Sequence, residues 1–219
     1  FQICINFNIK FLSANSGFLV VILFSLVRVR HMRKEKDSMG EMEVPDDALY
    51  GASTQRAVIN FPVSGHRMPS SFIQAMGYLK AACARANESL GKLDPEKSQL
   101  IQQVCQEIIN GELDEHFPVD VFQTGSGTSS NMNANEVIAN RASQIAGKPI
   151  GSKEPIHPND DCNLGQSSND TMPTALHVSV AVAIHQHLLP ALEGLHDQLD
   201  QKSKEFESFV KTGRTHLMD

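Results

Sequence analysis

The chain has 219 residues, of which 41% are hydrophobic and 20% charged, with a formal net charge of −6 at pH 7. This length suits one large or two small globular domains and allows a buried core. The negative charge argues against general nucleic-acid binding, because no basic surplus exists to neutralise phosphates. Aromatic residues make up only 6%, without any Trp, while aliphatic residues are plentiful, which favours helix-on-helix packing.

The cysteines indicate a reducing compartment. Cys4, Cys83, Cys105 and Cys162 are scattered, form no C-x-x-C pair, and two of them fall within apolar helical patterns. A disulfide framework is therefore not expected, and an intracellular location is the simplest interpretation.

The first 31 residues differ from the rest. No acidic residue precedes Glu35, and an apolar run extends from Phe18 to Val27. That run is too short to span a bilayer, and Arg28 and Arg30 follow it where a signal peptide would carry a small-residue cleavage site. We expect residues 1–31 to be a non-native upstream or leader segment and Met32 to be the natural start.

Residues 37–62 are punctuated by Gly and Pro and are expected to be extended or irregular. Apolar residues then recur at three- and four-residue steps from Phe72 to Leu90, which predicts a helix. Ser70 or Ser71 is its expected cap, and a glycine at 91 its end. No stretch of the chain shows a convincing strand alternation.

A second helix is predicted from Asp94 as N-cap with Pro95 in the first turn, ending near Gly111. A third is expected over about residues 131–146. After a second polar loop, an apolar stripe from Leu176 to Leu199 predicts the longest helix, which Pro190 should kink or split.

The polar stretch "QTGSGTSSNMNANEV", residues 123–137, has the composition of a linker but leads directly into a predicted helix. Its small residues would let backbone amides approach a ligand, its hydroxyls and amides are neutral donors, and the helix contributes a positive dipole end. No P-loop lysine follows. An anion-binding loop and a simple Gly/Ser helix cap both remain open.

The loop over residues 147–173 contains two motifs, "HPNDD" (157–161) and "GQSSNDT" (165–171). "SSND" is typical of a helix entry, with Ser or Asn as cap and Asp170 in the first turn. His157 lies beside Asn159 and Asp160, but this spacing is poor for a tetrahedral metal site, so no metal is expected. Near the end of the chain, His216 in "GRTHL" is a candidate proton-transfer group.

Together these motifs are far more specific than any of them alone. "GEMEVPDDALYGASTQRAVINFP", "TGSGTSSNMNANEVIANR", "HPNDD", "QSSNDTMPTALH" and "GRTHLMD" occur in the order seen in class II fumarases, and from about Arg33 to Asp219 the chain resembles the N-terminal part of such an enzyme. The resemblance to this fumarase/aspartase superfamily implies a mostly α fold. It implies an N-terminal lyase domain over residues 32–170 and the start of a long central helical bundle over 171–219.

The resemblance also implies an activity, the reversible hydration of fumarate to L-malate, a step of the tricarboxylic acid cycle. The implied partner is a small dicarboxylate, with no cofactor, nucleic acid or membrane, and the full-length protein would be a homotetramer. We expect a cytoplasmic location, with the mitochondrion as the alternative.

The resemblance assigns residue roles that the individual motifs leave open. His216 is implied as a catalytic proton-transfer residue acting on water or the leaving hydroxyl, and a secondary dicarboxylate site is implied at His157, Pro158, Asn159 and Asp160. Cys162, Leu164 and Gly165 depart from the family pattern in this second loop, as does Glu154. The implied substrate-binding residues are Ser126, Gly127, Thr128, Ser167, Ser168, Asn169 and Thr215.

One family motif does not occur in the sequence. The "GSSxMPxKxNP" loop, which supplies the catalytic serine in this family, is absent, so we expect this chain, as a fragment, to be inactive alone. Two alternatives stay open: an aspartate ammonia-lyase, and a non-catalytic helical fragment that serves oligomerisation.

Overall fold

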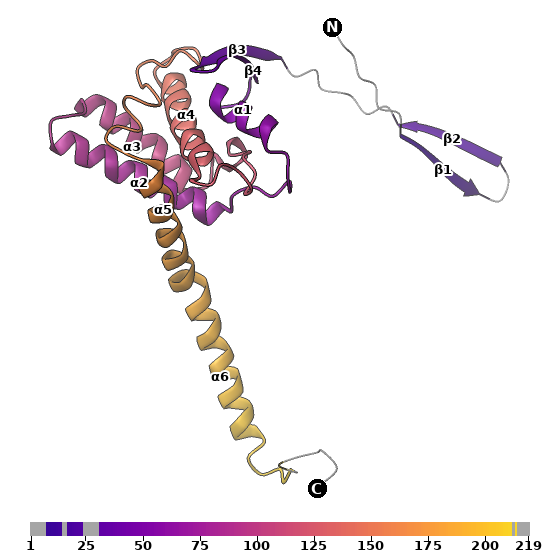
Figure 1. The fold of residues 1–219 in the computed structure, drawn as a ribbon. Helices are drawn as coiled ribbons and strands as arrows, with labels where there is room; N and C mark the ends of the chain where they lie inside the picture. The colour runs from indigo at the N-terminus through magenta and orange to yellow at the C-terminus, as the bar shows by residue number, and fades with distance from the viewer. Residues whose placement is uncertain (1–7, 15–16, 24–30, 212, 214–219) are drawn as a thin grey trace.

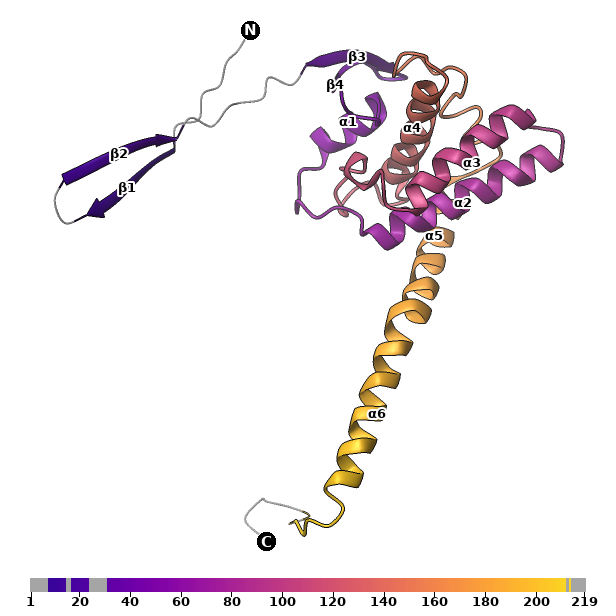
Figure 2. The same cartoon turned by 180° about the vertical axis from the view of Figure 1, so that it is seen from behind.

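The computed structural model describes residues 8–14, 17–23, 31–211 and 213. The fold is mostly helical, as expected. Four helices form a compact head, and a fifth leaves it to continue into a sixth as a projecting rod (Figure 1 and Figure 2). The helices are α1 (Ala52–Asn60), α2 (Ser70–Ser89), α3 (Pro95–Ile109), α4 (Thr128–Ile145), α5 (Ser168–Ala183) and α6 (Leu189–Glu205).

The expectation that the chain lacks strands is wrong. Two antiparallel hairpins are present: β1 (Asn8–Ala14) with β2 (Gly17–Leu23), and β3 (Met32–Asp37) with β4 (Gly40–Pro45). In β3 exposed and half-buried residues alternate strictly, but the half-buried ones are Arg33, Glu35 and Asp37. The strand escaped detection because its inward-facing residues are charged rather than apolar.

These inward charges are neutralised by specific partners. Arg33 donates to Glu35 Oε1 at 2.7 Å and to the Tyr50 carbonyl at 2.8 Å. Arg56 on α1 holds both oxygens of Asp37, at 2.8 and 2.9 Å, and this guanidinium lowers the pKa of Asp37 below its usual value. The segment 37–62 therefore contains strand β4, which agrees with the expected extended chain, and helix α1, which the expectation of extended or irregular chain missed.

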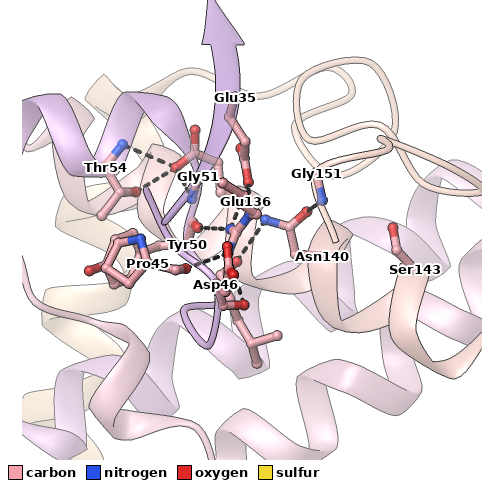
Figure 3. Close-up of polar contacts among 12 residues, drawn as sticks. Glu35, Pro45, Asp46, Tyr50, Gly51, Thr54, Glu136, Asn140, Ser143 and Gly151 are labelled. Atoms are coloured by element: carbon pink, nitrogen blue, oxygen red, sulfur yellow. Dashed lines mark hydrogen bonds and ion pairs between the residues drawn. The ribbon is translucent and has the colours of Figure 1, made fainter. Parts of the chain in front are cut away.

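Helix α1 is anchored by a buried carboxylate of α4 (Figure 3). Glu136 accepts hydrogen bonds from the backbone N–H groups of Gly51, Ser53 and Thr54 at 2.9 to 3.0 Å, and from the Thr54 hydroxyl at 2.6 Å. It thus satisfies the free N–H groups of the first turn of α1. Gly51 lies so close that a Cβ would overlap the Glu35 carboxylate. Burial raises the pKa of Glu136, an effect that these four donors oppose.

The core lies where α2, α3 and α4 pack, and contains Met76, Ile101 and Val137 among its buried residues. Asp94 caps α3 as predicted, accepting from the N–H groups of Glu96 and Lys97. The predicted serine cap of α2 is wrong, because the N-cap position is Pro69 and makes no side-chain cap bond. The hydroxyl of Ser70 instead donates to Asp114 of the neighbouring connection.

Pro190 changes the hydrogen-bond pattern of the rod without separating α5 from α6. A π-helical turn at Ile184–Leu188 joins them, in which the Leu189 N–H donates to the Ile184 carbonyl, five residues back. A proline cannot donate to the preceding turn, so a local change of register accommodates it. Figure 1 shows α5 and α6 as one continuous rod.

The rod is long and apolar enough to cross a membrane by length and composition, from Ser168 to Glu205. Most of its exposed large apolar residues nevertheless form one stripe with three- and four-residue spacing, with Leu189 beside it, while Glu193 and Asp197 occupy other faces. A single stripe is the pattern of a helix that packs against other helices. The exposed stripe consists of Leu176, Val180, Ile184, Leu188, Leu192, Leu195 and Leu199.

The Glu136 anchor yields a stability prediction. Glu136→Gln keeps the shape but places an NH₂ among four donors, so the free energy of unfolding should fall by about 1.5–3 kcal/mol. Urea unfolding measures this change, with the exposed Glu193→Gln as control. A loss for Glu136→Gln no larger than that of the control would show that the carboxylate does not hold α1.

Candidate functional site

The two polar motifs singled out in the sequence meet in space at the starts of α4 and α5. The Thr128 and Ser168 hydroxyl oxygens lie 2.9 Å apart, although 40 residues separate them. The Ser126 hydroxyl lies 2.7 Å from that of Thr128. All three side chains are accessible from solvent. The first turns of two helices, with their unpaired N–H groups and positive dipole ends, therefore face the same place.

Gly127 makes this turn possible. It is the N-cap of α4 with φ 67°, in the left-handed region, which a side chain disfavours. A Cβ there would overlap the side chain of Met172 on α5. The helix begins at Thr128, earlier than the predicted start near residue 131, so Ser129 and Ser130 belong to its first turn. Glycine thus allows both the left-handed backbone conformation at this position and the close packing of α5 against it.

The entry to α5 follows the sequence prediction. Ser167 is the N-cap and its Oγ accepts from the Asn169 N–H at 3.3 Å, with Asp170 in the first turn. Ser167 and Asn169 are exposed and Ser168 is half-buried, and of this motif Ser168 and Asn169 line the cavity described next.

A cavity of about 730 Å³ opens beside these two helix starts. Ser126, Gly127, Ser168 and Asn169 line one part of it, and no charged side chain lines it among the described residues. Another part of the wall is apolar and was not predicted, because its residues have the same spacing as core residues. This wall includes Met68, Phe72, Met172, Pro173 and Leu176.

A further set of contacts fixes the loop before α4. The Gln123 side chain accepts from the Ser130 N–H at 2.9 Å and donates to the Ser130 hydroxyl at 2.8 Å. Asp120 accepts from the N–H groups of Ser64, Gly65 and Phe122. Burial opposes ionisation of Asp120, but these hydrogen bonds and one from the Ser64 hydroxyl dominate and hold its pKa at about 2. The loop is therefore held at two points, Asp120 and Gln123.

The "HPNDD" turn lies elsewhere and lines none of this cavity. His157 Nδ1 accepts from the Asp160 N–H at 3.1 Å, and Lys97 on α3 holds both oxygens of Asp161 at 2.9 Å. Pro158 and Asn159 line a separate cavity of about 430 Å³, whose other polar residues include Glu35, Asp37 and Glu136. The structure thus separates the proposed secondary site from the first one.

Thr215 and His216, the remaining predicted site residues, lie outside the described residues. The residues that connect the two motifs internally were not singled out from the sequence: Asn131, Asn163 and Gln166 are joined by hydrogen bonds. Buried amides of this kind have no spacing pattern that distinguishes them from ordinary polar loop residues.

The geometry of Gly127 can be tested directly. Gly127→Ala should lower the free energy of unfolding by about 1–2 kcal/mol, because alanine disfavours the left-handed conformation. The overlap of the new Cβ with Met172 should lower it further. Gly125→Ala is the matched control, since a Cβ at Gly125 meets open space, and it should change stability by less than about 0.5 kcal/mol. Equal effects in urea unfolding would refute this account of the turn.

Comparisons with known proteins identify the family of the chain. The lyase family model matches residues 40–219. The chain is 54% identical over 187 residues to "Fumarate hydratase class II 1" of Pseudomonas aeruginosa, and 56% identical over 189 residues to "Fumarate hydratase class II" of Thermus aquaticus. Each match covers 85% of this chain and 40% of the relative. It thus spans about 40% of the length of these curated relatives.

Among solved structures, the native form of fumarate lyase:delta crystallin from Brucella melitensis superposes with a TM-score of 0.83 at 45% identity. This match covers 86% of this chain and 44% of the other. The sequence resemblance, the mostly helical fold and the match over most of the chain lead to one conclusion: the chain belongs to the lyase family, with class II fumarate hydratases among its relatives.

Proposed function

We propose that this chain is the dicarboxylate-binding part of a class II fumarate hydratase, which adds water reversibly to fumarate to give L-malate. The observation that carries the proposal is the contact between the Thr128 and Ser168 hydroxyls at 2.9 Å, which brings two helix N-termini together beside one cavity. The curated relatives described above bear this name, and they support hydration over ammonia release.

The chemistry fits a small dianion. Two converging helix N-termini and neutral hydroxyl and amide donors stabilise carboxylates without a lysine or arginine in the cavity wall. In the dehydration direction, a base removes the proton next to one carboxylate, and the resulting carbanion shifts negative charge onto that carboxylate. The hydroxide then leaves from the adjacent carbon with a proton from an acid. Donors already in position around the carboxylate stabilise this charge most in the transition state.

Within this proposal, the substrate-binding residues are Ser126, Gly127, Thr128, Ser167, Ser168 and Asn169, and Ser167 is also the N-cap of α5. Thr215 completes the binding set. His216 acts on the water or leaving hydroxyl, a role that suits an imidazole near neutral pH. The "HPND" turn serves as a secondary dicarboxylate site; the wall of the adjacent cavity contains Lys36 and Lys153 together with the carboxylates of Glu35, Asp37 and Glu136.

We further propose a division into a lyase domain over residues 32–170 and the beginning of a central bundle over 171–219, with assembly as a homotetramer. The exposed stripe on α5 and α6 supports the assembly, because such a surface is stabilised by burial against other helices. In this arrangement the rod has helical partners rather than a bilayer around it. The enzyme acts in the cytoplasm or the mitochondrion.

Activity is tested in a chimera. The aligned 189 residues of the Thermus aquaticus enzyme are replaced by the matching part of this chain, and loss of fumarate absorbance is followed. The chimera should hydrate fumarate, and Ser168→Ala within it should lower kcat/KM by roughly a hundredfold, because a charge-stabilising donor is removed. The isolated chain should show no turnover.

The controls separate the alternatives. Ser89→Ala removes an exposed serine on α2 and should leave kcat/KM unchanged. Ammonia release from L-aspartate, without fumarate hydration, would replace the proposal by an ammonia-lyase. A folded, tetrameric chimera with neither activity would favour the oligomerisation alternative.

A further inference from the structure

Lys80, in the middle of α2, is a buried cation with no acidic partner. Its relative exposure is 1%, and among the described residues that are fully buried it has the largest side chain. In the described part of the chain no carboxylate lies within ion-pair distance of its Nζ. Buried lysines are rare unless they are paired, so this residue requires an explanation.

The Nζ of Lys80 donates to two amide oxygens on the loop that leads into α5. It lies 2.8 Å from Gln166 Oε1 and 3.2 Å from Asn163 Oδ1. Gln166 immediately precedes Ser167, the N-cap of α5. The backbone carbonyl of Gln166 in turn accepts from the Asn163 side chain at 3.2 Å. Lys80 therefore holds the segment from which the "SSND" motif begins.

The same oxygen of Asn163 connects Lys80 to the start of α4. Asn163 Oδ1 accepts from Asn131 Nδ2 at 3.0 Å and from Asn135 Nδ2 at 3.3 Å. Asn131 lies in the first turn of α4, and its own Oδ1 accepts from the Thr171 hydroxyl on α5 at 3.3 Å. One buried network thus joins Lys80 to the beginnings of both helices.

From this geometry we infer that Lys80 is a positioning residue, which sets the register between the starts of α4 and α5 and thereby the spacing of the Thr128 and Ser168 hydroxyls. The hydrogen bonds of this network are present in the structure. Its importance for binding a dicarboxylate rests on the proposed function.

A purely structural role explains this choice of residue poorly. Removing a lysine from water disfavours its charged form, and a methionine of similar length would fill the same space without that cost. What methionine lacks is a donor that reaches two amide oxygens. The cation also places positive charge behind the two helix starts, where it adds to their dipoles.

The charge of Lys80 is sensitive to pH. Burial lowers its pKa to about 8, and the nearby thiols of Cys162, Cys83 and Cys105 act in the opposite direction. Those thiols belong to the loop, to α2 and to α3. Burial raises the pKa of all three, and that of Cys105 to about 12. The described side chains of α4 and α5 that hydrogen-bond within the network, those of Asn131, Asn135 and Thr171, are neutral. The charged groups that act on the thiols are Asp170 on α5, Asp161 in the loop and Lys97 on α3. Lys80 is therefore the group of this cluster that titrates near pH 8.

Amide hydrogen exchange on the full chain tests the inference. Lys80→Met should accelerate exchange at Gln166 and Thr171, whose N–H groups bond within the α5 entry, by about tenfold more than at Ala139 and Ala142 in the second half of α4. Lys92→Met, at an exposed lysine, should change neither set. Gln166→Leu removes an acceptor instead of the donor and should reproduce the local pattern, even if Lys80→Met fails to fold.

A second readout follows pH. In the unaltered chain the side-chain amide resonances of Asn163 and Gln166 should titrate with a midpoint near pH 8, and in Lys80→Met they should not. Uniform acceleration of exchange throughout the chain, or unchanged exchange and titration, would overturn the positioning role.

Fumarate itself is the probe for the link to function. Its affinity for the chain, followed by the Thr128 and Ser168 amide resonances, should weaken about tenfold in Lys80→Met. If the unaltered chain binds no fumarate but the local exchange pattern holds, the proposed function fails and the positioning role stands. If fumarate binds equally to both forms and exchange is unchanged, the positioning role fails and the proposed function stands.

Discussion

The approach of the Thr128 and Ser168 hydroxyls to 2.9 Å is the constraint on which the candidate site depends. It requires α4 and α5 to begin at the same point in space, although a long polar loop separates them in sequence. Gly127 permits this approach, since Met172 occupies the space that a Cβ would need. Because both helices begin there, their positive dipole ends add beside a cavity that no charged side chain lines among the described residues, which supports the proposed dicarboxylate site.

Around the apolar core, buried polar groups hold the loops and the helix starts in place. Glu136 satisfies the first turn of α1, and Asn140 donates to the Leu49 carbonyl at 2.9 Å and accepts from the Gly151 N–H at 2.9 Å. Lys80 likewise hydrogen-bonds to the side-chain amides of Asn163 and Gln166 at the entry to α5. Such groups are stabilising only while every partner is present, since each buried donor or acceptor left alone costs free energy. The head therefore specifies one loop arrangement rather than a family of similar ones.

The rod presents the opposite situation, with apolar side chains exposed along its length. Its stripe continues through the π-helical turn before Pro190, so the same face is kept from α5 into α6. Burial of this face would contribute roughly 25 cal/mol per Å² of apolar surface. A helix of this kind is stable as part of a bundle, which is consistent with the mostly helical lyase family to which the chain belongs.

Periodicity and capping determined much of the fold from the sequence alone, including α2, α3, the Asp94 cap and the Ser167 entry, because these signals are local. The motifs in their order also indicated the family. Tertiary structure alone decided the rest: the β3 strand, whose inward side is charged, the true start of α4 at Thr128, and the placement of Lys80 between two loops. These depend on partners distant in the chain, and a charge or amide becomes a structural element only when the fold brings its partner within hydrogen-bond distance.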